Sequence, residues 1–284
     1  MYNYIDLFHG IGGFAYGAWL AGIKFENHFC SDIESYTQKL YKLRFPDSIQ
    51  LGDITKIDTR ELKNKYGNKW IITGGFPCQD ISIAGKGSGI TGSRSGLWFE
   101  YWRIIRDLRP RFAIIENVPA ITFRGLDIVL GSLAEIFYNV EGQSISAKEI
   151  GANHKREREW LVAYPDDERL LYRQNEIESA KGGKPSQRDV SAKSQDVADT
   201  CCARLQESAC TKFGSIQSQV EESQGREFSR GNAKAWGNWS TEPDVGRLAH
   251  GIPNRVDRLK GLGNAIVPQI AELLFRRIKE IINV

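Results

Sequence analysis

Short apolar runs alternate with helix-patterned stretches over the first 164 residues, and this alternation limits the possible folds more than any other feature. Between the runs, residues 35–45 and 97–108 carry apolar side chains at helical spacing, and the first of these stretches stops at Pro46. Strands that alternate with helices predict βαβ units around a parallel sheet. We therefore expect an α/β fold, with buried strands at the runs YIDLF, FENHFC, WIIT, FAIIEN and EWLVAY.

The sequence changes character twice and so divides into three segments. Residues 1–165 carry the alternating pattern. Residues 166–241 are rich in Gln, Ser, Glu, Lys and Gly, with few aliphatic side chains, so we expect a small irregular domain or a mobile insertion there. Helical patterning returns in residues 242–284, where a long apolar face is formed by Ile270, Leu273, Leu274, Ile278 and Ile281.

Composition narrows the class of protein. Hydrophobic residues make up 41% and charged residues 26% of the 284 residues, so the chain can bury a core, and its net charge of +3 permits a polyanionic partner without requiring one. No apolar run is long enough to span a bilayer, and the start MYNYIDLFHG lacks the features of a signal peptide. The five cysteines are odd in number, so we expect a soluble cytoplasmic protein with reduced thiols. The spacing of Cys201, Cys202 and Cys210 is not that of a zinc site, and no metal is expected.

A glycine-rich turn follows the first predicted strand. Gly10, Gly12 and Gly13 lie between that strand and the next helix, where open α/β sheets bind cofactors, although the turn alone is equally typical of a tight loop. The second strand ends at Asp32 and Glu34. Asp32 is the better candidate for binding ribose hydroxyls and Glu34 the alternate, but either acid could simply cap the following helix.

Reactive and charged side chains occur at other predicted strand ends. Cys78 follows Pro77 in a glycine-flanked loop after WIIT, a position that favours a nucleophile over a structural thiol. Glu116 ends the run FAIIEN, where a carboxylate is costly to bury unless it has a partner or a chemical role. Arg156 and Arg158 precede EWLVAY, and strand alternation puts them on one face, although by themselves they could be a solvated charge run.

Taken together and in this order, these pieces resemble the DNA cytosine-5 methyltransferase family of bacterial or phage type. PCQ, then ENV, then R-x-R on an α/β scaffold is a highly specific combination, and the resemblance covers nearly all of the chain except about 166–241. The matching stretches are DLFHGIGGF, SDIE, GDI, GGFPCQDIS, RSGLWFE, IIENV, HKRERE and GLGNAIVP.

The resemblance implies a Rossmann-like doubly wound sheet of the S-adenosylmethionine-dependent type. Residues 1–165 would form the catalytic and cofactor-binding domain, and 166–241 a small target-recognition region. Residues 242–284 would return to the catalytic domain, with the last helix packed beside the first. Asp53, which alone could equally be a turn residue, gains a cofactor role from the same resemblance.

The same resemblance assigns the chemistry to four residues. Cys78 would add to carbon 6 of a flipped-out cytosine, which then attacks the methyl group of S-adenosyl-L-methionine. Glu116 would act as the acid at ring nitrogen N3, Arg158 would hold the base's O2, and Arg156 would support it as a neighbour. The sequence does not identify the base that removes the carbon 5 proton. The cofactor site would comprise Phe8, Gly10, Ile11, Gly12, Gly13, Asp32, Ile33, Asp53, Ile54, Pro77, Leu97, Asn264 and Ala265.

The implied partners are double-stranded DNA and a cognate restriction endonuclease. The enzyme itself is expected to be a monomer that does not bind a membrane. An RNA (tRNA) cytosine-5 methyltransferase and a non-catalytic DNA- or cofactor-binding homologue remain as alternatives. A nicotinamide-dependent oxidoreductase is the interpretation of the glycine turn taken alone, and it leaves Pro77 and Cys78 unexplained.

Overall fold

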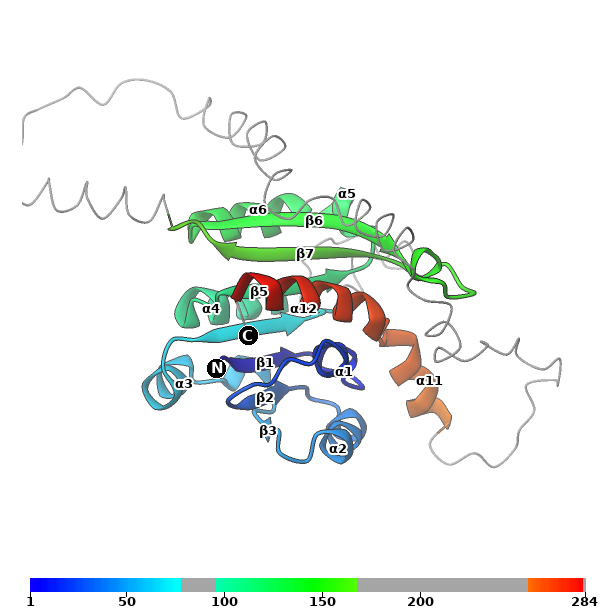
Figure 1. Cartoon of the computed structure of the whole chain (residues 1–284), viewed down its shortest axis with the longest axis horizontal. Coiled ribbons are helices and arrows are strands. Elements are labelled where there is room, and N and C mark those ends of the chain that lie inside the picture. Colours follow the sequence, from blue (N-terminus) through cyan, green and yellow to red (C-terminus); the bar gives the residue numbers. More distant parts are fainter. Residues whose placement is uncertain (78–95, 168–254, 283–284) are drawn as a thin grey trace, which may run out of the picture.

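The computed structural model describes residues 1–77, 96–167 and 255–282 (Figure 1). Within these residues seven strands form one sheet in the order β3-β2-β1-β4-β5-β7-β6. β1 to β5 are parallel, whereas β7 runs antiparallel to both β5 and β6. The strands are β1 (Asn3–Leu7), β2 (His28–Ser31), β3 (Ile49–Gln50), β4 (Trp70–Gly74), β5 (Phe112–Asn117), β6 (Tyr138–Ser146) and β7 (Glu157–Pro165).

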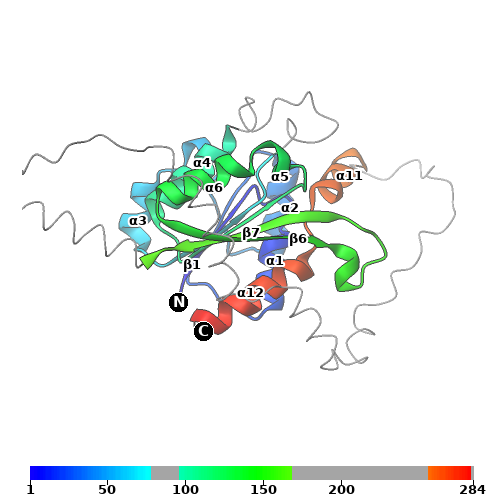
Figure 2. The same ribbon diagram turned by 90° about the horizontal axis from the view of Figure 1, so that it is seen from above.

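Helices cover both faces of the sheet, as Figure 2 shows. One core lies between the sheet and α3, α4 and α6, around Trp98 and Ile105, and the other lies between the sheet and α1 and α12, around Phe14 and Phe275. The helices are α1 (Gly13–Leu20), α2 (Ser35–Arg44), η1 (Ile54–Lys56), α3 (Thr59–Tyr66), α4 (Leu97–Leu108), α5 (Ile121–Arg124), α6 (Leu126–Glu135), η3 (Ala147–Ile150), α11 (Arg255–Asn264) and α12 (Pro268–Ile282). The arrangement is the doubly wound α/β fold that the family resemblance implies.

The first and last helices pack side by side, although most of the chain separates them in sequence. A Cβ atom at Gly17 of α1 would lie 2.6 Å from the Ala271 Cβ atom and 2.7 Å from the Pro268 carbonyl oxygen of α12. Only glycine therefore permits this approach. Ile270, Leu274 and Ile278 of α12 are fully buried in the same core, which confirms the expected packing of the last helix beside the first.

The structure also corrects the sequence interpretation. The run EWLVAY forms an antiparallel strand, not another parallel one, because β6 and β7 are joined as a hairpin through η3. β6, α3 and α6 have no counterpart among the predicted elements. The C-terminal helical stretch is two helices, since the chain leaves helical geometry at Ala265 and restarts at Pro268, a residue suited to the first turn of a helix.

Cys30 lies buried within β2, as expected of a structural thiol. The helices of the described ranges include none with the length and apolarity to cross a membrane. Cys78 and the whole of 168–254 lie outside the described residues. The expected region 166–241 is therefore described only at Asp166 and Asp167.

Candidate active site

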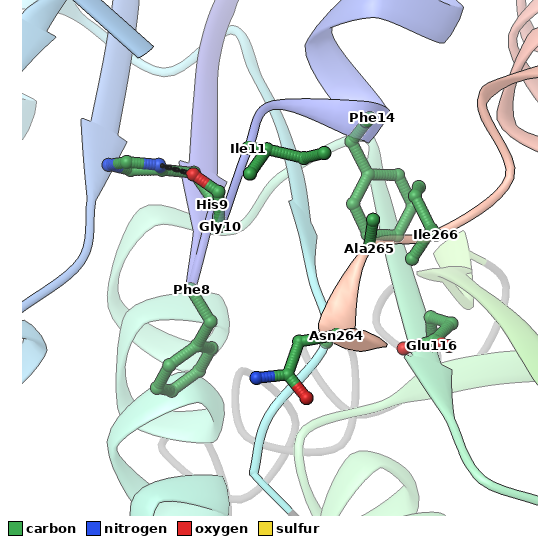
Figure 3. A pocket seen from close by; sticks show the side chains of 11 residues that line it. Phe8, His9, Gly10, Ile11, Phe14, Glu116, Asn264, Ala265 and Ile266 are labelled. Carbon is green, nitrogen blue, oxygen red and sulfur yellow. Dashed lines mark hydrogen bonds between the residues drawn. The ribbon is translucent and has the colours of Figure 1, made fainter. Parts of the chain in front are cut away.

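A pocket lies at the carboxyl ends of β1, β4 and β5, where the strand order changes direction and open α/β sheets bind ligands (Figure 3). The turn after β1 supplies most of one wall. The start of the loop after β4, the end of β5 and the connection between α11 and α12 supply the rest. The lining residues are Phe8, His9, Gly10, Ile11, Gly13, Phe14, Gly75, Glu116, Asn264, Ala265 and Ile266.

The glycine turn presents its backbone to this pocket. Gly10 has φ +51° and Gly12 has φ +84°, left-handed conformations in which a side chain would be strained. Asp32 at the end of β2 holds the turn, because its Oδ2 accepts a hydrogen bond of 2.9 Å from the Gly10 N–H. A Cβ atom at Gly10 would have only the Phe8 carbonyl oxygen near it, at 3.9 Å. The bare backbone thus leaves a cradle that a ligand could fill.

Glu116 lies at the end of β5 with its carboxyl group in the wall of the pocket. Its Oε1 forms an ion pair of 3.0 Å with Arg158 Nε, and a Cβ atom at Gly75 would lie 2.7 Å from its Oε2. Only 8% of Glu116 is exposed. Burial raises the pKa of Glu116 to about 7, and the nearby arginines Arg158 and Arg156 act in the opposite direction. This carboxyl can therefore give or take a proton near neutral pH.

The second arginine of the pair has a different set of contacts. Glu116 stands opposite Trp160 in the β5–β7 register, so strand alternation puts Arg158 on the same face as Glu116, whereas Arg156 lies directly before the strand. Arg156 Nη2 donates hydrogen bonds to the carbonyl oxygens of Gly263 (3.0 Å) and Ala265. The guanidinium thereby holds the two residues that flank Asn264 in the chain.

Asn264 itself lies at the mouth of the pocket. Figure 3 shows its side chain extending into the space between Phe8 and Glu116. Behind it, Ile266 lies against the glycine turn, since a Cβ atom at Gly13 would be 2.5 Å from Ile266 Cγ1. The C-terminal part of the chain therefore completes a pocket that the N-terminal part begins.

The structure gathers some of the residues predicted for the cofactor and leaves others apart. Phe8, Gly10, Ile11, Gly13, Asn264 and Ala265 line the pocket together with Glu116. The side chain of Ile33 points to solvent, with 71% exposed, and that of Ile54 is buried in the core. Asp53 caps η1, accepting hydrogen bonds from the backbone and side chain of Thr55. Pro77, Leu97 and Gly12 are outside the lining set, and Cys78 is beyond the described residues.

Sequence reasoning missed several parts of this site. Phe14, Gly75 and Ile266 line the pocket, and each lies inside or beside a recognised motif. Beneath the glycine turn, Asp6 is fully buried and forms hydrogen bonds of 3.0 Å with both Tyr41 and Thr73. Burial raises the pKa of Asp6 to about 8. An acid inside the apolar run YIDLF was the signal available for this buried network.

The lining chemistry suits a ligand with both flat and polar parts. Phe8 and Phe14 offer aromatic rings, the glycine turn offers backbone groups, and Asn264 offers an amide that can donate and accept. At the opposite side, Glu116 and Arg158 place a titratable proton beside a permanent cation. The residues present therefore fit a nucleoside-type cofactor next to a site of proton transfer.

Comparisons with known proteins agree with this chemistry. A family model described as C-5 cytosine-specific DNA methylase matches residues 2–244. The Type II methyltransferase M1.ScrFI of Lactococcus lactis subsp. cremoris is 37% identical over 167 residues, which cover 57% of this chain and 41% of the relative. The Type II methyltransferase M.HhaI of Haemophilus parahaemolyticus is 30% identical over 169 residues, covering 58% and 50%. The chain spans about half the length of the curated relatives it matches.

Among solved structures, the S. pombe Dnmt2 methyltransferase matches with a TM-score of 0.59 and covers 100% of both chains. Its identity to this chain is 15%, so the likeness concerns the fold. That fold is the α/β arrangement described above.

Proposed function

Because this chain belongs to the C-5 cytosine-specific DNA methylase family, we propose that it transfers a methyl group from S-adenosyl-L-methionine to carbon 5 of a cytosine in double-stranded DNA. The Glu116–Arg158 pair carries the proposal. A carboxyl group with a pKa near 7 can protonate a ring nitrogen at neutral pH, and a guanidinium beside it can hold a carbonyl oxygen. A pyrimidine offers both groups on one edge.

The pocket supports a role for the glycine turn and Asn264 in holding the methyl donor. S-adenosyl-L-methionine supplies an electrophilic methyl group when bound. The turn would approach it through bare backbone, while Asp32 would bind its ribose and Asp53 with Ile54 its adenine. The remaining proposed contacts are Phe8, Ile11, Ile33, Pro77, Leu97 and Ala265.

The proposed reaction begins with the thiolate of Cys78, which forms a bond to carbon 6 of cytosine. Glu116 delivers a proton to N3 as electrons move into the ring, and Arg158 holds O2. Carbon 5 then attacks the methyl group, whose bond to the donor sulfur breaks so that S-adenosyl-L-homocysteine is released. Carbon 5 loses its proton to a base, the bond between Cys78 Sγ and carbon 6 breaks, and N3 returns its proton to Glu116, which restores the aromatic ring. Carbons 5 and 6 are inaccessible within a stacked duplex, so the target base must be flipped out.

The oligomeric state, location and partner that we propose rest on the same family membership. We propose that the protein acts as a monomer in the cytoplasm of a bacterial cell. A cognate restriction endonuclease that cleaves the same sequence would be its partner. Both relatives named above carry the name Type II methyltransferase, which supports this context.

Methylation can be measured directly in a host that lacks cytosine methylation. Bisulfite sequencing of DNA from cells expressing the full chain should reveal one methylated sequence context, and Cys78→Ala should abolish it while S-adenosyl-L-methionine still binds. In vitro, duplex DNA and tRNA are offered separately with labelled donor, and we expect transfer to DNA. Transfer to tRNA alone would replace DNA with RNA as the substrate.

A covalent adduct gives a second, independent readout. Duplex DNA carrying 5-fluorocytosine should form a denaturation-resistant complex with the protein, because fluorine cannot leave as a cation. The complex should be missing with Cys78→Ala. Residual activity of that variant within tenfold of the unmodified protein would remove Cys78 from its role.

A further inference from the structure

Arg158 in β7 and Arg156 directly before this strand have different partners. Arg158 contacts Glu116, whereas Arg156 Nη2 donates to the carbonyl oxygens of Gly263 and Ala265. A sequence separation of 107 residues lies between Arg156 and Gly263. Two arginines only two residues apart in the sequence therefore contact different walls of the pocket.

We propose that Arg156 is a positioning residue for the methyl donor, which acts through Asn264 by fixing the segment Gly263–Ile266 as the outer wall of the donor pocket. This inference rests on the proposed function for the identity of the donor. It assigns Arg156 no contact with cytosine and no part in proton transfer.

The segment that Arg156 holds needs such an anchor. It connects α11 to α12, and residues 265–267 between these helices are not helical. The Ala265 N–H donates a backbone hydrogen bond to the Leu262 carbonyl oxygen. Its length of 3.3 Å exceeds that of most such bonds, so the bond is weak. One guanidinium nitrogen that engages carbonyls on both sides of Asn264 limits the freedom of that residue to turn away from the pocket.

A second tie between the C-terminal segment and the rest of the protein lies at the surface. Lys260 Nζ forms an ion pair of 2.7 Å with Glu34 Oε1, but about half of each side chain is exposed. Solvent and salt screen such pairs, which contribute little to stability. Arg156 is half-buried and reaches carbonyl groups adjacent to Asn264, so it is better placed to control the geometry of the pocket.

The backbone at Arg156 supports a specific role for this side chain. Arg156 has φ +24°, outside the regions that non-glycine residues ordinarily adopt. On its N-terminal side, the Lys155 carbonyl accepts hydrogen bonds from the Ala147 N–H (2.9 Å) and the Ser146 hydroxyl (2.5 Å). The chain is thus held in an unfavourable conformation directly before β7, and from this position the Arg156 guanidinium reaches the end of α11.

The test compares Arg156→Met with Arg158→Met, the same change two residues further along the chain. S-adenosyl-L-homocysteine serves as the probe, and calorimetry measures its dissociation constant. Arg156→Met should weaken binding at least tenfold, Arg156→Lys about threefold because an ammonium retains charge and donors, and Arg158→Met less than threefold. In single-turnover methylation at saturating donor, Arg158→Met should lose most of its rate, and Arg156→Met should lose much less.

A double-mutant cycle tests whether Arg156 acts through Asn264. Asn264→Ala should itself weaken binding, and the double variant Arg156→Met with Asn264→Ala should bind no more than threefold weaker than the weaker single variant. Additive effects, or an unchanged dissociation constant for Arg156→Met, would overturn the proposal. Loss of transfer rate in Arg156→Met with unchanged probe binding would overturn it as well and make Arg156 part of the chemistry.

A ligand-free measurement separates this proposal from the proposed function. Amide hydrogen exchange at Ala265 should be at least tenfold faster in Arg156→Met than in the unmodified protein, while exchange in the sheet stays the same. If the unmodified protein fails to bind the probe, the proposed donor is wrong, and the exchange result still decides whether Arg156 anchors the segment. If Arg156→Met does not fold, the exchange measurement uses Arg156→Lys, for which exchange at Ala265 should be about threefold faster than in the unmodified protein, and unchanged exchange would overturn the proposal.

Discussion

Two opposing electrostatic effects meet in the side chain of Glu116. Burial disfavours the carboxylate and raises its pKa, and the guanidinium of Arg158 at 3.0 Å favours the carboxylate and lowers its pKa. Burial is the larger effect, so the pKa lies at about 7. The residue is therefore divided between its acidic and basic forms at neutral pH, which is the condition for moving a proton in either direction.

The pH dependence of methyl transfer should report this balance. The proposed role requires protonated Glu116, so the single-turnover rate should fall as pH rises through about 7. Arg158→Met removes a cation that lowers the pKa, so the descending limb should move to higher pH even though the rate itself falls. Arg158→Lys keeps a positive charge and should leave the limb close to its original position. A limb that does not move in Arg158→Met would show that another group titrates there.

Asp32 combines a structural and a proposed binding role. Its Oδ2 accepts from the Gly10 N–H, and its Oδ1 accepts from the Glu34 N–H, both at 2.9 Å. Asp32→Ala should weaken S-adenosyl-L-methionine binding by about tenfold to a hundredfold, equivalent to about 1.5–3 kcal/mol for hydrogen bonds to a charged group. Glu34→Ala is the matched control. Loss of the exposed ion pair between Glu34 and Lys260 should lower the free energy of unfolding by at most about 1 kcal/mol. Titration calorimetry measures the dissociation constants of both variants. If Glu34→Ala weakened binding and Asp32→Ala did not, the ribose contact would be assigned to Glu34.

The candidate site shows which residues a sequence can reveal. Glu116 and Asp32 were recognisable because an acid at the end of a buried strand is unusual and the strand itself is visible in the pattern. The partner of Arg156 was not recognisable, since its carbonyl acceptors belong to backbone groups far along the chain. Whether Cys78 reaches the pocket stays a prediction, because it lies outside the described residues.

At the scale of elements, the contact between α1 and α12 fixes the pocket. Gly17 allows the two helices to approach, Gly13 allows Ile266 to lie against the glycine turn, and both residues belong to α1. Ile266 in the loop before α12 is thereby held against the glycine turn. The position of Asn264 therefore depends on the packing of α1 against α12 as well as on the hydrogen bonds from Arg156 to its neighbours.

Two glycine substitutions should have opposite effects on stability. Alanine favours a helix over glycine by about 1 kcal/mol, but overpacking a tight contact costs about 1–3 kcal/mol. Gly17→Ala should therefore lower the free energy of unfolding, because its methyl group would meet Ala271 at 2.6 Å. Gly131→Ala, in α6 with nothing within 4 Å of the new atom, should raise it. Urea denaturation of both variants provides the comparison, and a stabilised Gly17→Ala protein would contradict the close approach.

Some helices and strands could be predicted from the sequence and others could not. The parallel strands β1, β4 and β5 were visible because they are short, buried and mainly apolar runs with turn residues at their ends. β6 was not, because it lies at the edge of the sheet and its centre carries Glu141, Gly142 and Gln143, which obscure its alternation. α12 was predicted from its apolar face, but the break before Pro268 depends on the tertiary contact with α1.

At the scale of the molecule, the parts described on either side of residues 168–254 form one packed body. The pocket takes residues from both parts, and α12 buries its apolar face against the sheet and α1. The proposed methyl transfer uses no residue from 168 to 254. The polar composition of residues 166–241 favours DNA contacts in that segment instead, because Gln, Ser, Arg and Lys bind phosphates and base edges.

Replacing residues 170–235 with a Gly/Ser linker should separate the two activities. S-adenosyl-L-homocysteine should bind with an unchanged dissociation constant, since Gly10 and Asn264 can still meet. Sequence-specific methylation should disappear, and the salt dependence of DNA binding should become weaker as phosphate-contacting cations are lost. A filter-binding series in salt with bisulfite sequencing measures both effects. Retention of the original methylation pattern would move sequence recognition elsewhere in the chain.

The position of Asn264 also sets the moment at which the protein can first bind its donor during synthesis. The ribosome delivers the glycine turn, Glu116 and Arg156 early, yet 107 residues separate Arg156 from Gly263, roughly 5–20 s at about 5–20 residues per second. Through that interval the face that α12 will cover stays open, and the donor pocket lacks a wall. Donor binding should therefore begin only after Asn264 and α12 have been synthesised and α12 has packed against α1.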